Sequence, residues 1–147
     1  MSFSHVPAEL RRFVTARAEH LCEYCLLAEE DLWFGCQIDH VISEKHGGLT
    51  VAENLALACV NCNRSKGSDI GSLHPASGQF LRFYNPRIDR WAKHFRLVDA
   101  HIEATTPRGE VRAKILNFNV WDRILERQSL RGIARYPNRR ALHLINA

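Results

Sequence analysis

The sequence lacks any run of about 18 consecutive apolar residues, so it offers no segment that could cross a membrane as a helix. The first residues, Met1–His5, lack the basic stretch followed by an apolar one that a secretory signal needs. We therefore expect a cytoplasmic protein, and disulfides are rare in that reducing compartment. Internal repeats are also absent. We therefore expect neither a membrane protein nor a secreted one, and no repeat architecture.

The chain is short, and its composition permits only a small core. At 147 residues it has the length of one domain. Its apolar fraction of 46% can build a core, but a core of this size gains from a metal ion that ties the chain together.

The cysteines are few and are arranged in pairs. Cys22 and Cys25 form one Cys-x-x-Cys pair, and Cys59 and Cys62 form another after 33 intervening residues. This spacing predicts a structural zinc site with four thiolate ligands and no open position for chemistry. The alternative is a set of disulfides or idle thiols. Cys36 is left over, and we expect it to act as a small buried apolar residue.

Polar residues stand between and just after the two pairs. They are Asp39-His40, then Asn54-Leu55, then Asn63 and Lys66 directly after the second pair. The series resembles the zinc-stapled form of the HNH nuclease family. In that family the third position is often His, whereas here it is Asn63, a familiar variant that we interpret as a change of metal ligand.

The resemblance implies an α+β fold with a ββα-metal core. We expect strands at 36–42 and 55–58, a helix at about 60–68, and a loop at 43–50 that a capping box at 50–53 closes with one helical turn. The core with an N-terminal helix at 7–20 would occupy residues 1–73, and an extension packed on it would occupy residues 74–147.

The resemblance also implies a role for each polar residue. Asp39 and Asn63 would hold one catalytic Mg²⁺ or Mn²⁺ ion, since oxygen donors suit these ions. His40 would be the general base that takes a proton from water. Asn54 would hold the loop after His40, and Lys66 would meet the phosphate. Taken alone, an Asp-His pair is more often a surface hydrogen bond than a site.

The extension carries apolar, extended and basic segments. Residues 96–104 and 110–116 alternate as in a hairpin with a turn at 105–109, and Asn119 would cap a helix at about 120–130. We expect Trp91 and Trp121 to be buried. Three arginines recur every four residues along that helix, as a phosphate-binding strip or a solvated face: Arg123, Arg127 and Arg131.

The net charge of +4 is unevenly distributed. Residues 21–58 carry a net charge of −6, and residues 106–147 carry +6. An acidic region suits a divalent cation and a basic region suits a phosphate backbone, although ordinary surface charge could give the same pattern.

Two functions remain open from the sequence. The first is a metal-dependent endonuclease that hydrolyses DNA, with RNA not excluded. The second is a non-catalytic, zinc-stapled module that binds nucleic acid. The three residues Asp39, His40 and Asn63 favour the nuclease, because a binding module needs none of them. The sequence names neither a target nor an oligomeric state.

Overall fold

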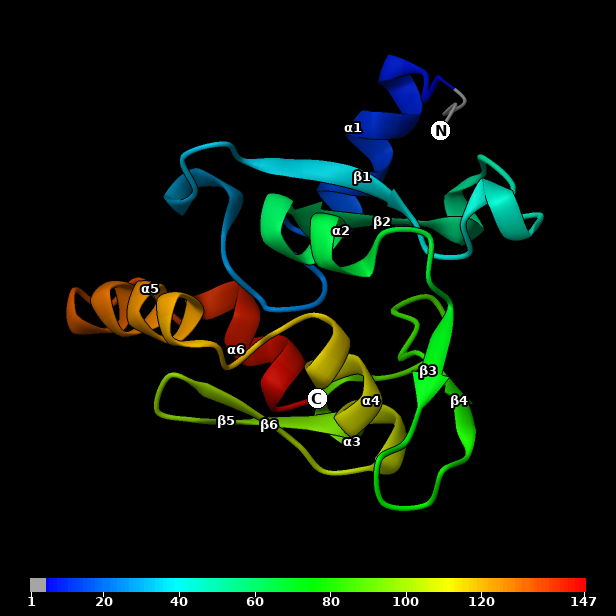
Figure 1. Cartoon of the computed structure of the whole chain (residues 1–147). Coiled ribbons are helices and arrows are strands. Elements are labelled where there is room, and N and C mark those ends of the chain that lie inside the picture. The colour runs from blue at the N-terminus through cyan, green and yellow to red at the C-terminus, as the bar shows by residue number, and fades with distance from the viewer. Residues whose placement is uncertain (1–4) are drawn as a thin grey trace.

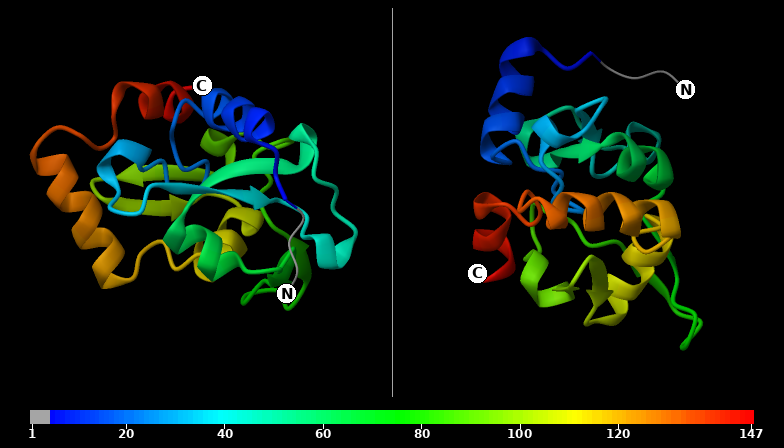
Figure 2. Two further views of the ribbon diagram at one scale, coloured as in Figure 1. Left: turned by 90° about the horizontal axis from the view of Figure 1, so that it is seen from above. Right: turned by 90° about the vertical axis from the view of Figure 1, so that its left-hand side faces the viewer.

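The computed structural model describes residues 5–147 (Figures 1 and 2). The expectation that the chain carries no secretory signal rests on Met1–His5, and residues 1–4 lie outside the described part. Within the described part, no helix has the length and apolar character required to cross a membrane.

The core is a two-stranded antiparallel sheet followed at once by a helix. Strands β1 (Cys36–His40) and β2 (Leu55–Cys59) pair with Cys36 opposite Cys59 and His40 opposite Leu55. Helix α2 (Val60–Lys66) begins directly after β2. The predicted order of strand, loop, strand and helix is confirmed. Because the sheet has two strands, the second edge of β1 stays open.

A helix covers each face of this sheet (Figure 1). On one face lies α1 (Ala8–Arg17), whose Val14 packs with Leu55 and Leu57. On the other face lies α2, which contacts both strands. The predicted N-terminal helix ends earlier than expected, because Glu19 and His20 adopt positive φ angles of 53° and 60°, which a right-handed helix does not allow.

The extension begins with strands and differs from the predicted hairpin. The structure pairs β5 (Phe95–Val98) with β6 (His101–Ala104), so the turn lies at residues 99–100. Residues 107–115, predicted to lie mostly in a turn and a strand, form helix α4 (Pro107–Ile115). Thr106 caps α4 by accepting a hydrogen bond from the Gly109 amide, and Pro107 occupies the first turn. Proline favours that helical position and cannot donate in a sheet, so the local signals select a helix.

The long helix α5 (Trp121–Gly132) forms where a helix was predicted, but Asn119 does not cap it. The Asn119 side chain instead bonds the backbone of Ile102, through N–H at 3.0 Å and C=O at 2.9 Å. Trp121 is 70% exposed, so its predicted burial is wrong. Trp91 is buried as predicted and donates to the Tyr24 carbonyl at 2.8 Å.

One cluster of buried residues joins the cysteine segment to the extension. It includes Cys22, Phe95 and Tyr136, and the Tyr136 hydroxyl donates to the Cys25 carbonyl at 2.8 Å. The remaining elements are short or terminal: η1 (Glu29–Asp31), η2 (Glu44–His46), η3 (Ala52–Asn54), β3 (Gly71–Leu73), β4 (Phe80–Arg82), α3 (Trp91–His94) and α6 (Arg139–Ile145).

Candidate functional site

The four paired cysteines converge on one buried point. Their Sγ atoms lie within 4.8 Å of one another, and Cys25 and Cys59 are separated by 3.7 Å. Zinc–sulfur bonds of about 2.3 Å place tetrahedral sulfurs about 3.8 Å apart. A disulfide would need about 2 Å, so all four remain free thiols. The cluster therefore fits a structural zinc ion, as the sequence predicts.

A buried arginine from the extension contacts this cluster. Arg123 is 5% exposed and donates from Nη2 to the Cys62 sulfur at 3.2 Å, with the Cys59 sulfur at 3.8 Å. Its Nη1 donates to the Leu116 carbonyl at 2.6 Å. Four thiolates around Zn²⁺ leave two negative charges, and the guanidinium offsets one of them. Arg123 therefore serves the metal site and is not available to a phosphate.

A second arginine of the predicted strip on α5 also points into the protein. Arg127 is fully buried and donates to the carbonyls of Ala100 and Phe118 at 2.7 and 2.6 Å. The guanidinium fork satisfies carbonyls that the surrounding turns leave unpaired. Arg131 is exposed and forms an ion pair with Asp99 at 3.3 Å.

Some of the basic side chains of the extension form ion pairs with acidic side chains of the acidic segment. From the extension, Arg135 pairs with Asp31 and Arg140 pairs with Glu30. The basic extension thus docks on the acidic segment, and these two ion pairs use part of the charge asymmetry within the molecule.

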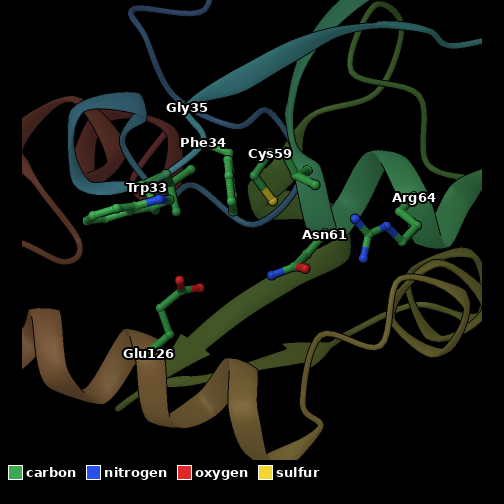
Figure 3. A pocket seen from close by; sticks show the side chains of 9 residues that line it. Trp33, Phe34, Gly35, Cys59, Asn61, Arg64 and Glu126 are labelled. Carbon is green, nitrogen blue, oxygen red and sulfur yellow. The ribbon is translucent and has the colours of Figure 1, made fainter.

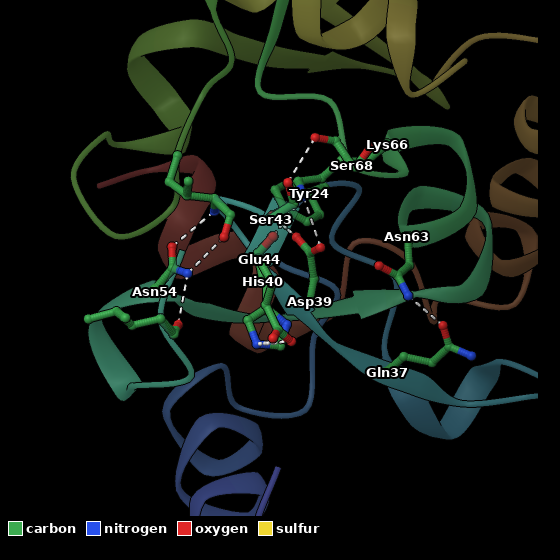
Figure 4. A network of polar contacts seen from close by, with 12 residues as sticks. Tyr24, Gln37, Asp39, His40, Ser43, Glu44, Asn54, Asn63, Lys66 and Ser68 are labelled. Atoms are coloured by element: carbon green, nitrogen blue, oxygen red, sulfur yellow. Dashed lines mark hydrogen bonds and ion pairs between the residues drawn. The ribbon is translucent and has the colours of Figure 1, made fainter. Parts of the chain in front are cut away.

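A cleft of about 360 Å³ runs along the open edge of β1, and both His40 and Asn63 line it. His40 Nε2 lies 2.9 Å from the Thr50 hydroxyl and 3.5 Å from Glu44 Oε1 (Figure 4). Thr50 therefore orients the imidazole instead of capping η3, whose first turn has no side-chain cap. Asn63 donates from Nδ2 to Gln37 Oε1 at 2.6 Å. The structure thus brings two of the three predicted site residues together.

Arg11 lines the same cleft, and the sequence interpretation missed it. It lies on α1, is exposed, and uses Nε to donate to the Val6 carbonyl at 3.2 Å. The signal that could have found it is its position on the polar side of an amphipathic helix. The sequence does not reveal that this side faces the edge of β1.

Asp39 lies on the opposite face of β1 from His40, because successive strand residues point to opposite faces. It is 4% exposed and does not line the cleft. Its two oxygens accept from the Tyr24 hydroxyl at 2.5 Å and from Lys66 Nζ at 3.1 Å (Figure 4). The expected convergence of Asp39 with His40 on a single pocket is therefore absent in this arrangement.

Lys66 is buried rather than turned toward a phosphate. It is 1% exposed and also donates to the His40 carbonyl at 2.8 Å. Burial lowers the pKa of Lys66, and the negative charge of Asp39 opposes that shift. The ammonium ion pairs with Asp39 and joins α2 to β1, so the structure does not present Lys66 to a phosphate, and the predicted phosphate contact stays a prediction.

A catalytic cation fits the donor types but not their present arrangement. A carboxylate and an amide oxygen suit Mg²⁺ or Mn²⁺. Both oxygens of Asp39 are occupied, however, and a positively charged ammonium already lies beside them. Gln37 and Asp39 share the face of β1 toward α2, where they contact Asn63 and Lys66 respectively (Figure 4).

Asn54 fixes the loop that follows His40. Its Oδ1 accepts from the Ile42 amide, and its Nδ2 donates to the carbonyls of Ile42 and Leu49, each at 2.9 Å. Since this loop carries Thr50, the amide of Asn54 acts on His40 indirectly.

A family model matches the centre of the chain. Residues 22–69, about a third of the sequence, match the family model described as HNH endonuclease. The match spans both cysteine pairs and the polar residues between them, and it confirms the resemblance drawn from the motifs. No curated protein matches the chain significantly.

Proposed function

We propose that this protein, whose residues 22–69 match the HNH endonuclease family, hydrolyses phosphodiester bonds of DNA in the cleft along the open edge of β1. One observation carries the proposal: His40 and Asn63 come from different elements of the matched segment and line the same cleft. An imidazole and an amide at an open edge can meet a phosphodiester without any opening of the fold.

His40 is the proposed general base. A neutral imidazole can accept a proton from an attacking water near pH 7, a step worth about 10²–10⁴ in rate. The Thr50 hydroxyl beside Nε2 orients the ring. Arg11 supplies the positive charge that a phosphate in this cleft needs, in place of the buried Lys66, Arg123 and Arg127.

We propose Asp39 and Asn63 as the residues that hold the catalytic Mg²⁺ or Mn²⁺ ion. When bound, such an ion neutralises charge on the phosphate and on the leaving oxygen. Their shared location between β1 and α2 supports this assignment. Because the Lys66 ammonium ion pairs with the Asp39 carboxylate, the assignment requires that the metal replace this ammonium ion.

The test is cleavage of supercoiled plasmid DNA with Mg²⁺, with Mn²⁺, and without added divalent ion. The wild type should nick the plasmid only with metal, and His40→Ala should lower the rate at least 100-fold, as expected for loss of a general base. His101→Ala is the matched control, because His101 is exposed on β6, away from the cleft. Full activity of His40→Ala with normal zinc content would refute the role of His40.

A second candidate is a zinc-stapled module that binds nucleic acid without cutting it. The Asp39 carboxylate, which Tyr24 and Lys66 already bond, favours this candidate. A module that only binds needs no free carboxylate for a metal, and a neutralised strand repels a phosphate backbone less. Binding of the same plasmid in a mobility-shift assay, without cleavage under any metal condition, would select it. An RNA substrate in parallel reactions separates DNA from RNA cleavage.

A further inference from the structure

A rigid turn exposes two large aromatic side chains. Trp33 is 93% exposed and Phe34 is 78% exposed. The turn itself is well fixed: the Gly35 amide donates to the Leu32 carbonyl at 3.2 Å, and Gly35 adopts a φ of +63° that favours glycine. Two adjacent aromatic side chains held in water by a fixed turn do not stabilise the fold by burial. Such a paired, exposed apolar surface points to a ligand.

These aromatics form one wall of a hollow of about 300 Å³ next to the zinc site (Figure 3). The opposite walls come from the start of α2 and from α5. Asn61 and Glu126 point into the space, and Arg64 stands at its side (Figure 3). Within residues 5–147, the side chains of these three polar residues have no hydrogen bond or ion pair.

We propose that this hollow binds an unpaired base of the nucleic acid, stacked on Trp33, with Arg64 on the adjoining phosphate. This inference rests on the proposed action on nucleic acid. Aromatic platforms bind unstacked bases through their π-faces. An amide and a carboxylate can read the edge of a base, and a carboxylate accepts hydrogen bonds from an exocyclic amino group.

The polar residues distinguish this ligand from an apolar peptide. A peptide side chain would bury the carboxylate of Glu126 and the guanidinium of Arg64 without hydrogen-bond partners, which costs free energy. A nucleotide offers a flat apolar face, an amino group and a phosphate together. Helix α2 links the hollow to the cleft, because Arg64 lines the hollow and its chain neighbour Asn63 lines the cleft. A strand in the cleft could thus place a neighbouring base on Trp33.

The test measures binding alone, so that it does not depend on catalysis. His40→Ala protein, with zinc content verified and no other divalent ion added, is titrated with short single-stranded DNA of cytosine, adenine or thymine. The tryptophan fluorescence should be quenched, and the quenching should disappear in Trp33→Phe but persist in Trp121→Phe. Trp121 is the matched control, since it is 70% exposed on α5 and does not line the hollow.

Loss of the stacking surface in Trp33→Ala should raise the Kd about tenfold, within the range for one stacked base. Glu126→Gln should reduce the preference for cytosine and adenine over thymine. Cleavage by the wild type with unquenched Trp33 would overturn the inference and leave the proposed nuclease intact. Quenching without any cleavage would support the hollow and refute the nuclease. A third outcome combines two observations. If DNA does not quench the tryptophan fluorescence, and Trp33→Ala without DNA sediments differently from the protein with Trp33, the hollow binds a second copy of this chain.

Discussion

The Nη2 group of Arg123 lies 3.2 Å from the sulfur of Cys62, although 60 residues separate them in the sequence. The contact makes the extension part of the zinc site. It also explains how helix α5 tolerates a buried guanidinium: the thiolates, the Leu116 carbonyl and the ring of Phe118 surround it. The metal site and the extension should therefore be lost together.

The first prediction concerns this arginine. Arg123→Met keeps the apolar contact with Phe118 but removes the charge that offsets the thiolates. We expect zinc affinity to fall about 10–100-fold, as for other residues that support metal ligands. Transfer of zinc to a coloured chelator measures the change. Arg131→Met, on the exposed side of the same helix, is the control and should behave as wild type.

Unfolding of Arg123→Met would leave that comparison ambiguous, so Arg123→Lys provides a second variant. It keeps a positive charge but cannot donate to both the sulfur and the carbonyl. An intermediate rate of zinc loss is expected from it. Wild-type zinc retention in both folded variants would show that Arg123 does not support the metal.

The core could be predicted from the sequence because many recognisable residues lie close together in its segment. The cysteine spacing and the Asn54 and Asn63 positions fall within one short segment, and the pattern fixes strand, loop, strand and helix. The extension has weaker signals. Alternating residues at 110–116 suggested a strand, but the Thr106 cap and Pro107 outweigh them. The arginine spacing on α5 was correct, yet spacing alone does not tell whether a helix face meets solvent or the core.

The candidate site could be predicted in composition but not in orientation. Asp39 and His40 are neighbours in sequence, and the pleat of β1 directs them to opposite faces. The sequence contains no sign that Tyr24 and Lys66 would seal the carboxylate, because both come from other segments. The position of Arg11 depends on how α1 packs on the sheet. These are tertiary relationships that local pattern cannot supply.

The second prediction tests whether Lys66 is structural. Lys66→Met leaves the buried carboxylate of Asp39 without its charge partner, and breaking a buried pair costs about 3–5 kcal/mol. The free energy of unfolding in urea should fall by that amount. The double variant Asp39→Asn with Lys66→Met should recover much of the loss. A loss below about 1 kcal/mol in Lys66→Met would contradict the structural role.

The third prediction concerns stability in weak acid. His94 is buried against Thr106, and burial lowers its pKa below the usual 6.5. Between these two pKa values the unfolded chain binds more protons than the folded one, so the free energy of unfolding falls as the pH drops below 6.5. Urea unfolding at several pH values from about 8 to about 5, which spans the titration of histidine, should show the fall in the free energy of unfolding. His94→Gln should lose less stability over the same interval.

The fourth prediction tests the loop that carries Thr50. A Cβ atom at Gly48 would lie 1.7 Å from the Ile42 carbonyl oxygen and 2.8 Å from Asn54 Nδ2. Gly48→Ala should therefore displace the loop, cost about 1–3 kcal/mol and reduce cleavage by disturbing His40. Gly132→Ala is the control, because its Cβ would meet nothing within 4 Å. Equal free energies of unfolding for the two variants would show that the loop can shift without cost and would contradict the prediction.

The fifth prediction assigns the phosphate contact to Arg11. Arg11 lines the cleft beside His40 and Asn63, whereas Arg12 is exposed on the same helix and does not. Arg11→Ala should weaken DNA binding for all sequences and lower the slope of log K against log salt by about 1, as expected for one phosphate contact. Arg12→Ala should leave the slope nearly unchanged. Binding is measured without added divalent ion, so that cleavage does not interfere. Equal slopes for Arg11→Ala and the wild type would place the phosphate elsewhere, and the cleft along β1 would then need another source of positive charge.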